Sequence, residues 1–189
     1  MIKSYAPHPS LRLLLAVGFM VCALASLAEA EDEVSPAVRS TVMSVLETLQ
    51  DQTMNEEEKK TLVASIVAER FDFESMTSRV LATNWKRANA AQKRRVTALF
   101  QGMLTETYWK KFATFSGEEV EFLSMQNRSS DHASFHTVIK SKTARRPVDY
   151  KLFRTGDTWK AYDVVIEQVS LVRNYRGKFQ SIVRKGGIA

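Results

Sequence analysis

The chain has 189 residues, of which 44% are hydrophobic and 25% charged, and this composition excludes a disordered or fibrous protein and fits one globular domain. The formal net charge of +6 favours anionic surfaces or an acidic partner. No glycine-rich or arginine-rich tract indicates nucleic-acid binding, so we expect no nucleic acid among its ligands.

The first thirty residues have the pattern of a secretory signal peptide. Lys3 and Arg12 supply positive charge, residues 11–27 are largely apolar, and Ala28-Glu29-Ala30 is typical of a cleavage site. An uncleaved anchor is the alternative, but the apolar run is short for a membrane span. We therefore expect residues 1–30 to be a cleaved signal peptide and the protein to be exported to the periplasm.

The exported part of the chain is expected to be a single domain over residues 31–189. Cys22, the only cysteine, lies in the expected signal peptide, so no disulfide would stabilise the domain. Apolar residues recur at helical spacing in residues 35–115 and at strand spacing from residue 118. We therefore expect a helical part over 35–115, followed by a sheet and a last helix over 118–185.

Four helices are predicted in the first part. Ser35 before Pro36 predicts the start of a helix that runs through Gln50. Asn55 with Glu58 resembles a capping box that opens the second helix. The third is short, over about residues 74–81, and an irregular link over 83–85 follows it. Asn89 with Gln92 forms another capping pair before the longest helix, which ends before Ser116-Gly117.

Four strands and a helix are predicted in the second part. Alternating residues indicate strands over 120–125, 133–139, 148–154 and 159–166, and the short polar links between them favour an antiparallel meander. Ser170 is a plausible N-cap for the last helix. Helices followed by strands predict an α+β fold, with helices covering one face of a strongly bent sheet of four or more strands.

Both predicted layers carry many large aromatic side chains. If these side chains hold the layers apart, an apolar hollow between the long helix and the sheet would suit a lipid. If they interdigitate, they form a solid core. Periodicity does not decide between the two. The residues concerned are Trp85, Tyr108, Phe112, Phe115, Tyr150, Phe153, Trp159 and Tyr162.

The sequence contains little that indicates catalysis or metal binding. His132 and His136 are four residues apart in a predicted strand, roughly 13 Å along it, which is too far for one metal ion. No metal motif, phosphate loop or nucleophile elbow occurs, and we expect no metal and no cofactor. Asp163, in an apolar strand, is either a general base or, as is commoner for a buried aspartate, a hydrogen-bonded structural group.

Three segments resemble the MlaC (toluene-tolerance) family of periplasmic phospholipid-transport proteins. They are FDFESMTSRVLATNW (71–85), AQKRRVTALFQGMLTETYWKKF (91–112) and VDYKLFRTGDTWKAYDVVIEQVSLVRNYRGKFQSIVRKGG (148–187). The W-K-A-Y-D strand, the V-S-L-V-R-N-Y-R helix start and the K-G-G ending are the most specific parts.

The resemblance implies a shuttle that is not an enzyme and that encloses phospholipid tails between a cystatin-like sheet and packed helices. Its expected partners are an inner-membrane ABC lipid transporter complex and an outer-membrane lipoprotein complex, and the chain itself is expected to be a monomer. Carried onto this chain, the wall around the lipid tails would consist of Trp85, Phe100, Leu104, Tyr108, Tyr150, Trp159, Tyr162, Val164, Ile166 and Val169.

The chain departs from the family pattern at two positions and near its end. Ala82 and Gln168 stand where the family usually has glycine, and a Cβ there would alter a turn or narrow the entrance. Family members commonly continue beyond the position of Ala189 into a further helix. These departures leave open a carrier of another apolar lipid, such as a hopanoid. A small enzyme that uses Asp163 and a filled module that only scaffolds an envelope complex are the competing hypotheses.

Basic residues of the last predicted helix are candidates for contact with an acidic partner or a phosphate group. Arg173, Arg176 and Lys178 lie outside its apolar stripe. Simple solvation is the alternative for each of them.

Overall fold

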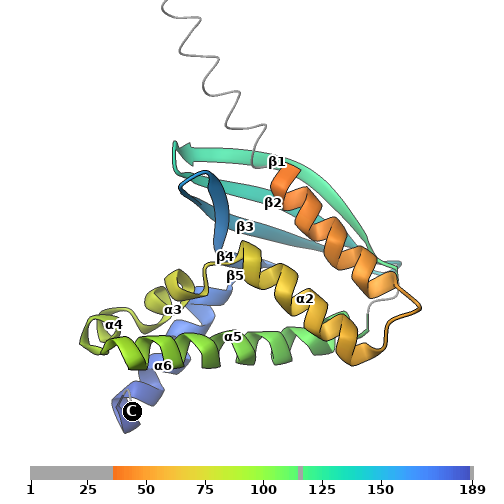
Figure 1. Ribbon diagram of the computed structural model, residues 1–189. Helices are drawn as coiled ribbons and strands as arrows, with labels where there is room; N and C mark the ends of the chain where they lie inside the picture. Colours follow the sequence, from red (N-terminus) through yellow and green to blue (C-terminus); the bar gives the residue numbers. More distant parts are fainter. Residues whose placement is uncertain (1–35, 115–116, 188–189) are drawn as a thin grey trace, which may run out of the picture.

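An antiparallel sheet bends over a group of helices in the computed structural model, which describes residues 36–114 and 117–187 (Figure 1). The α+β fold class is therefore confirmed. The expected signal peptide over residues 1–30 and the expected N-cap Ser35 lie outside the described residues. The helices are helix 36–50, α2 (Glu56–Arg70), α3 (Phe73–Leu81), α4 (Thr83–Arg87), α5 (Ala90–Phe112) and α6 (Leu171–Gly186).

The sheet is a meander in the order β1-β2-β3-β4-β5, and consecutive strands are antiparallel. Its strands are β1 (Glu119–Ser129), β2 (His132–Lys140), β3 (Arg145–Thr155), β4 (Thr158–Ile166) and β5 (Val169–Ser170). The sequence predicts neither the short β5 nor the extension of β1 to Ser129. The register of β1 against β2 shifts twice, at Phe122/Ser124 and at Asn127/Ser129, and such irregularities bend and twist a strand.

The helix starts follow the capping chemistry of the sequence. Asn55 accepts from the Glu58 N–H while the Glu58 carboxylate accepts from the Asn55 N–H, and Asn89 with Gln92 repeats this arrangement. Ser170 accepts from the Arg173 N–H and is the N-cap of α6. These three predictions are confirmed. The segment over residues 83–85, expected to be irregular, instead begins α4.

Most of the buried apolar side chains fall into three clusters that meet at Phe71. The first lies between α3, α5 and α6: Phe73, Met76, Val80, Phe100, Leu104, Val172 and Tyr175. The second lies on the sheet: Ala133, Phe135, Leu152, Trp159 and Ala161. The third joins the sheet to α6: Val148, Val164 and Leu171. Phe71 packs against all three because it lies where the chain passes from α2 to α3, beside Ala161 of β4.

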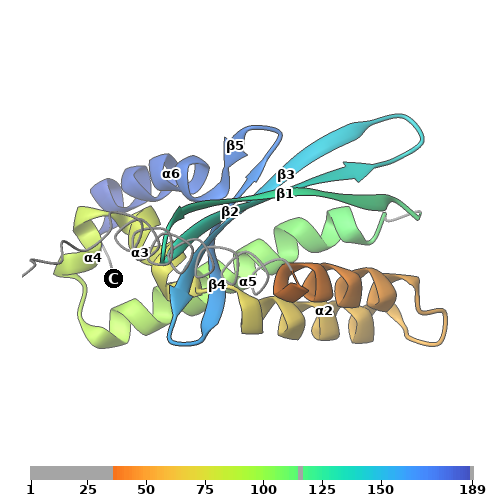
Figure 2. The ribbon, with the colours of Figure 1, turned by 90° about the horizontal axis from the view of Figure 1, so that it is seen from above.

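Helix 36–50 and α2 form a hairpin on one side of the sheet (Figure 2). The Lys59 ammonium donates to the Leu49 carbonyl at 3.0 Å, which ties α2 to helix 36–50. The Lys60 ammonium lies 2.6 Å from the Glu106 carboxylate of α5. The indole N–H of Trp109, also on α5, donates to Glu56 at 3.1 Å. Polar contacts therefore attach the hairpin to α5.

The two departures from the family pattern lie at strained backbone positions. Ala82 has φ of 51° and Gln168 has φ of 68°, values that favour glycine because a Cβ is crowded there. Ala82 separates α3 from α4, and Gln168 lies in the turn between β4 and β5. Neither residue lines the pocket between helix 36–50 and the sheet, so the added Cβ atoms strain turns and do not narrow that pocket.

Candidate functional site

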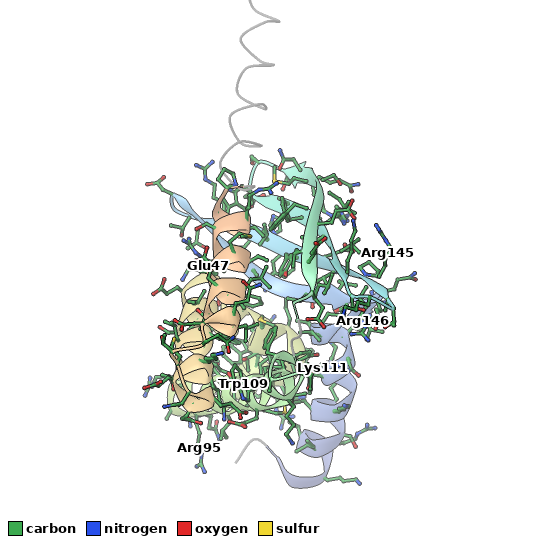
Figure 3. The ribbon with its side chains drawn as sticks, turned by 90° about the vertical axis from the view of Figure 1, so that its right-hand side faces the viewer. Glu47, Arg95, Trp109, Lys111, Arg145 and Arg146 are labelled. Carbon is green, nitrogen blue, oxygen red and sulfur yellow. The ribbon has the colours of Figure 1, made fainter. Side chains whose placement is uncertain are left out.

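A small apolar pocket lies between helix 36–50 and the face of the sheet that this helix covers. Figure 3 shows the helix and the sheet on opposite sides, with side chains filling the space between them. The pocket has a volume of about 40 Å³, room for a few water molecules, whereas sites for organic ligands have roughly 300–1,000 Å³. It is lined by Ala37, Val38, Thr41, Val42, Arg70, Phe71, Tyr150, Leu152, Trp159 and Ala161.

The residues of the pocket wall follow from the helical spacing of apolar residues in helix 36–50 and from the strand alternation in β4. Val38 and Val42 are four residues apart, so they lie on one face of helix 36–50. Trp159 and Ala161 are two residues apart in β4 and face the same side of the sheet. Leu152 of β3 pairs with Ala161 and adds to the same face. An amphipathic helix and an alternating strand thus present their apolar sides to each other.

The end of α2 closes the pocket at the centre of β4. Phe71 forms a parallel bridge with Ala161, and the Asp72 N–H donates to the Ala161 carbonyl at 2.9 Å. The Asp72 carboxylate also accepts from the Ser75 N–H and so caps α3. Because these contacts fix the chain next to β4, the side chains of Arg70 and Phe71 reach the pocket.

Tyr150, Trp159 and Arg70 are residues with polar groups among those that line this largely apolar pocket. Burial raises the pKa of Tyr150 to about 12, against a hydrogen bond with Thr137 that lowers it, so the phenol is neutral at physiological pH. The Trp159 Nε1–H is buried without a hydrogen-bond partner among the described residues, which costs about 1–3 kcal/mol. Arg70 is partly exposed, and within the described ranges its guanidinium has no ion-pair or hydrogen-bond partner.

Tyr150 and Trp159 are the two residues of the expected lipid wall that line this pocket. Phe100 and Leu104 lie in the cluster between α3, α5 and α6, where Phe100 is 0% exposed and has its ring edges against Tyr175 and Phe179. Their role in holding a ligand stays a prediction.

Three further residues of the expected wall surround the cluster that joins the sheet to α6. Val164 is buried in it, and Tyr108 and Ile166 pack against it while partly exposed. Burial raises the pKa of Tyr108. These residues lie between the long helix and β4, where the family resemblance implies a hollow, whereas the small apolar pocket described above lies under helix 36–50.

The last three residues of the expected wall lie apart from the pocket. Tyr162 contacts His132, Phe153 and the Arg79 guanidinium, which lies 4.5 Å from its ring centroid. Trp85 of α4 lies beside the Lys93 ammonium of α5. Val169 of β5 is 54% exposed.

Asp163 has the contacts of a structural carboxylate. It is 4% exposed, and its oxygens accept from the Ser170 hydroxyl at 2.7 Å and from the Val172 N–H at 3.1 Å. The Lys151 ammonium lies 3.4 Å away. Because Ser170 caps α6, Asp163 joins β4 to the start of that helix. These contacts agree with the structural interpretation of Asp163 and leave its oxygens engaged.

Among the residues that the structure describes, the histidines and acidic residues do not gather into a metal site. His132 and His136 each contact an aspartate, Asp131 at 2.9 Å and Asp149 at 2.8 Å. In the part of the chain that the structure describes, no group of three or more potential ligands could hold a metal ion. No helix among the described residues is long and apolar enough to cross a membrane.

The basic residues singled out in the last helix lie away from the pocket. Arg173 is exposed, Arg176 donates to the Arg79 carbonyl at 2.8 Å, and the Lys178 ammonium lies 5.2 Å from the Tyr175 ring centroid. Their expected contact with an acidic partner or a phosphate group stays a prediction.

Of three other arginines, Arg70 lines the pocket and Arg145 and Arg146 do not. Arg145 and Arg146 lie at the start of β3 and point outward in Figure 3. Arg70 is the cation that the structure places at the pocket wall.

Sequence reasoning missed the helical side of the pocket. The apolar stripe of helix 36–50 is visible in the sequence. Periodicity does not tell which layer a helix covers, so the sequence alone does not place Val38 and Val42 against the sheet. Arg70 gives no signal, since a basic residue in the last turn of a helix is ordinary. Phe71 is visible as part of the Phe71-Asp72-Phe73 segment between two helices.

Comparison with known proteins gives a family and a fold. A family model described as MlaC protein matches residues 37–189. A solved structure of a phospholipid-binding protein from Ralstonia solanacearum, in complex with a phospholipid, is similar with a TM-score of 0.71 and 20% sequence identity. The similarity covers 84% of this chain and 90% of that one, and at this identity it establishes the fold. A search of curated proteins found no match.

Proposed function

Because the chain belongs to the MlaC protein family, we propose that it is a phospholipid carrier of the periplasm. It holds the acyl chains between helix 36–50 and the sheet and moves lipid between an inner-membrane ABC transporter complex and an outer-membrane lipoprotein complex. The observation that carries the proposal is the family match over residues 37–189, together with an apolar pocket on the same domain.

The driving force for loading is the transfer of acyl chains out of water. Each buried methylene contributes about 0.8 kcal/mol, so two chains supply far more free energy than contacts of the head group. The pocket of about 40 Å³ is too small for them, and loading requires one wall to move. Opening costs free energy in proportion to the packing that is lost, so the most weakly packed wall moves first.

Helix 36–50 is the wall that can move with the smallest loss of buried contacts. Within residues 36–50, Thr48 is the one buried residue, and the apolar side chains are partly exposed or, as with Met43 at 43%, exposed. In contrast, β4 in the opposite wall buries four of its nine residues: Trp159, Ala161, Asp163 and Val164. We therefore assign the opening motion to helix 36–50 and expect the sheet to stay in place.

The proposed carrier is not an enzyme. The Asp163 carboxylate, the acidic group that best suited a general base, is occupied by the Ser170 hydroxyl, the Val172 N–H and the Lys151 ammonium. Removal of this carboxylate is expected to lower stability, because it loosens the attachment of α6 to β4. No catalytic step is proposed.

The proposal is tested by extracting lipid from the purified protein. The full chain is produced in a Gram-negative host, recovered from the periplasmic fraction, extracted with organic solvent and examined by mass spectrometry. We expect recovery in that fraction with about one phospholipid per protein. Co-purification of a hopanoid in place of a phospholipid would change the proposed cargo to a hopanoid. A cooperatively folded protein that contains no lipid, and takes up none from phospholipid vesicles, would contradict the carrier and favour an interaction module.

A further inference from the structure

One end of the molecule is built from segments that carry basic side chains and no acidic ones. The chain has no aspartate or glutamate between Glu74 and Glu106, and none after Glu167. Figures 1 and 2 both show α4, the first turns of α5 and the last turns of α6 gathered at this end. We call it the basic end and define it by its exposed cationic residues: Lys86, Arg87, Arg94, Arg95, Arg184 and Lys185.

The cations of the basic end are not paired with carboxylates. Among the described residues, none of the six forms an ion pair. The turn between helix 36–50 and α2 lies at the other end of the molecule in Figure 1 and is acidic, with Asp51, Glu56, Glu57 and Glu58. An anionic surface would therefore attract the basic end and repel this turn, and so orient the molecule.

Two large apolar side chains are exposed among these cations. Leu99 is 64% exposed and lies four residues after Arg95, so both are on one face of α5. Arg95 points away from the molecule in Figure 3. Ile182 of α6 is 61% exposed. The rings of Phe100 and Phe179, with centroids 5.6 Å apart, join α5 to α6 at this end. The basic end thus presents cations and apolar side chains together.

Exposed apolar side chains among cations are typical of a surface that binds an anionic bilayer. The cationic groups lie near the lipid phosphates, while the apolar side chains enter the boundary between head groups and acyl chains. An acidic protein would also attract the cations, but it would need recesses that fit Leu99 and Ile182. A bilayer needs no such fit, because its lipids rearrange around the side chains. The combination therefore favours a membrane.

We propose that the basic end is a docking surface for an anionic membrane, with its cations at the lipid phosphates and with Leu99 and Ile182 in the head-group layer. None of these residues lines the pocket under helix 36–50. That helix lies toward the other end of the molecule in Figures 1 and 2, so it stays free to open while the protein is docked. The inference goes beyond the proposed carrier function, since it concerns where the protein attaches and not what the pocket holds.

Simple solvation is the competing explanation for exposed cations, because lysine and arginine are ordinary surface residues. If solvation is their only role, attachment to an anionic membrane depends on the net charge of the protein and not on which cations are removed. A docking surface makes the position of the cations matter. Two double variants with the same change in net charge therefore separate the two explanations.

The test measures co-sedimentation of the purified protein with vesicles that contain dioleoylphosphatidylcholine and dioleoylphosphatidylglycerol in equal amounts. Vesicles of dioleoylphosphatidylcholine alone are the comparison without net charge, and binding to them should be weak. Each basic residue near an anionic surface strengthens binding roughly fivefold, so Arg94→Gln/Arg95→Gln should weaken binding to the anionic vesicles about thirtyfold. The matched control is Arg145→Gln/Arg146→Gln at the exposed start of β3, which should weaken it less than about threefold.

The apolar part of the surface is tested separately. Leu99→Gln/Ile182→Gln should weaken binding several-fold and remove the part of the binding that persists at high salt, since salt screens the cations alone. Equal losses in the two arginine double variants, or unchanged binding of Leu99→Gln/Ile182→Gln, would overturn the docking surface. No binding of the unchanged protein to the anionic vesicles would overturn the membrane as its partner. Retention on immobilised polyglutamate that Arg94→Gln/Arg95→Gln abolishes would then assign the basic end to an acidic protein.

The lipid content of each variant separates this inference from the carrier function. The substituted side chains are exposed, so the variants are expected to fold normally. They should also contain as much phospholipid as the unchanged protein, because none of these residues lines the pocket. Loss of vesicle binding with normal lipid content would support the docking surface. Proteins that contain no lipid but still bind the anionic vesicles through the basic end would overturn the carrier and leave the docking surface intact.

Discussion

Replacing Phe100 by alanine is expected to lower the free energy of unfolding by about 3–5 kcal/mol. Phe100 is 0% exposed and lies between α3 and α6, with edge contacts to Tyr175 and Phe179. The substitution removes these contacts and leaves a cavity, because the surrounding helices relax only partly. Urea unfolding followed by circular dichroism measures the difference.

The neighbouring residue provides the control for this substitution. Leu99 is 64% exposed on the same helix, so Leu99→Ala should change the free energy of unfolding by no more than about 0.5 kcal/mol. A Phe100→Ala variant of nearly normal stability that no longer binds lipid would contradict the placement of Phe100 in the core. It would restore Phe100 to the lipid wall that the family resemblance implies.

The second large effect is expected at Asp163. Asp163→Ala should cost about 3–5 kcal/mol, because it leaves the Val172 N–H, the Ser170 hydroxyl and the nearby Lys151 ammonium without their shared partner. Asp163→Asn keeps one acceptor oxygen and should cost less. Thermal and urea unfolding of both variants measure the order of the two effects.

Lipid loading separates this structural role from a catalytic one. Folded Asp163→Asn protein is expected to bind phospholipid like the unchanged protein, since Asp163 does not line the pocket. An Asp163→Ala variant of unchanged stability would contradict the attachment of α6 to β4 through this carboxylate.

The elements of the fold are predictable where local chemistry decides them. Asn55 with Glu58 and Asn89 with Gln92 place helix starts, because each pair satisfies free N–H groups of the first turn. The alternation from Trp159 to Ile166 predicts β4. The glycines that the family resemblance implies at the positions of Ala82 and Gln168 would suit the positive φ angles that the structure has there.

The site is less predictable than the elements, because residue spacing shows which side of a helix or strand is apolar but not which element packs against that side. Phe100 and Trp159 are both large aromatic residues on apolar faces, yet one is enclosed by α3 and α6 and the other lines the pocket. The small side chains of helix 36–50 give no sign that they cover the sheet. Arg70 becomes distinctive through the position of Phe71 against β4, which is a tertiary contact.

The central claim is that lipid tails enter between helix 36–50 and the sheet, and photolabelling tests it most directly. A phospholipid with a photoactivatable diazirine near the end of one acyl chain is loaded, activated and mapped by peptide mass spectrometry. We expect labels in helix 36–50, around Val38 and Val42, and on β3 and β4, around Leu152 and Trp159. Labels confined to exposed apolar residues outside the pocket, such as Leu99 and Ile182, would contradict the claim.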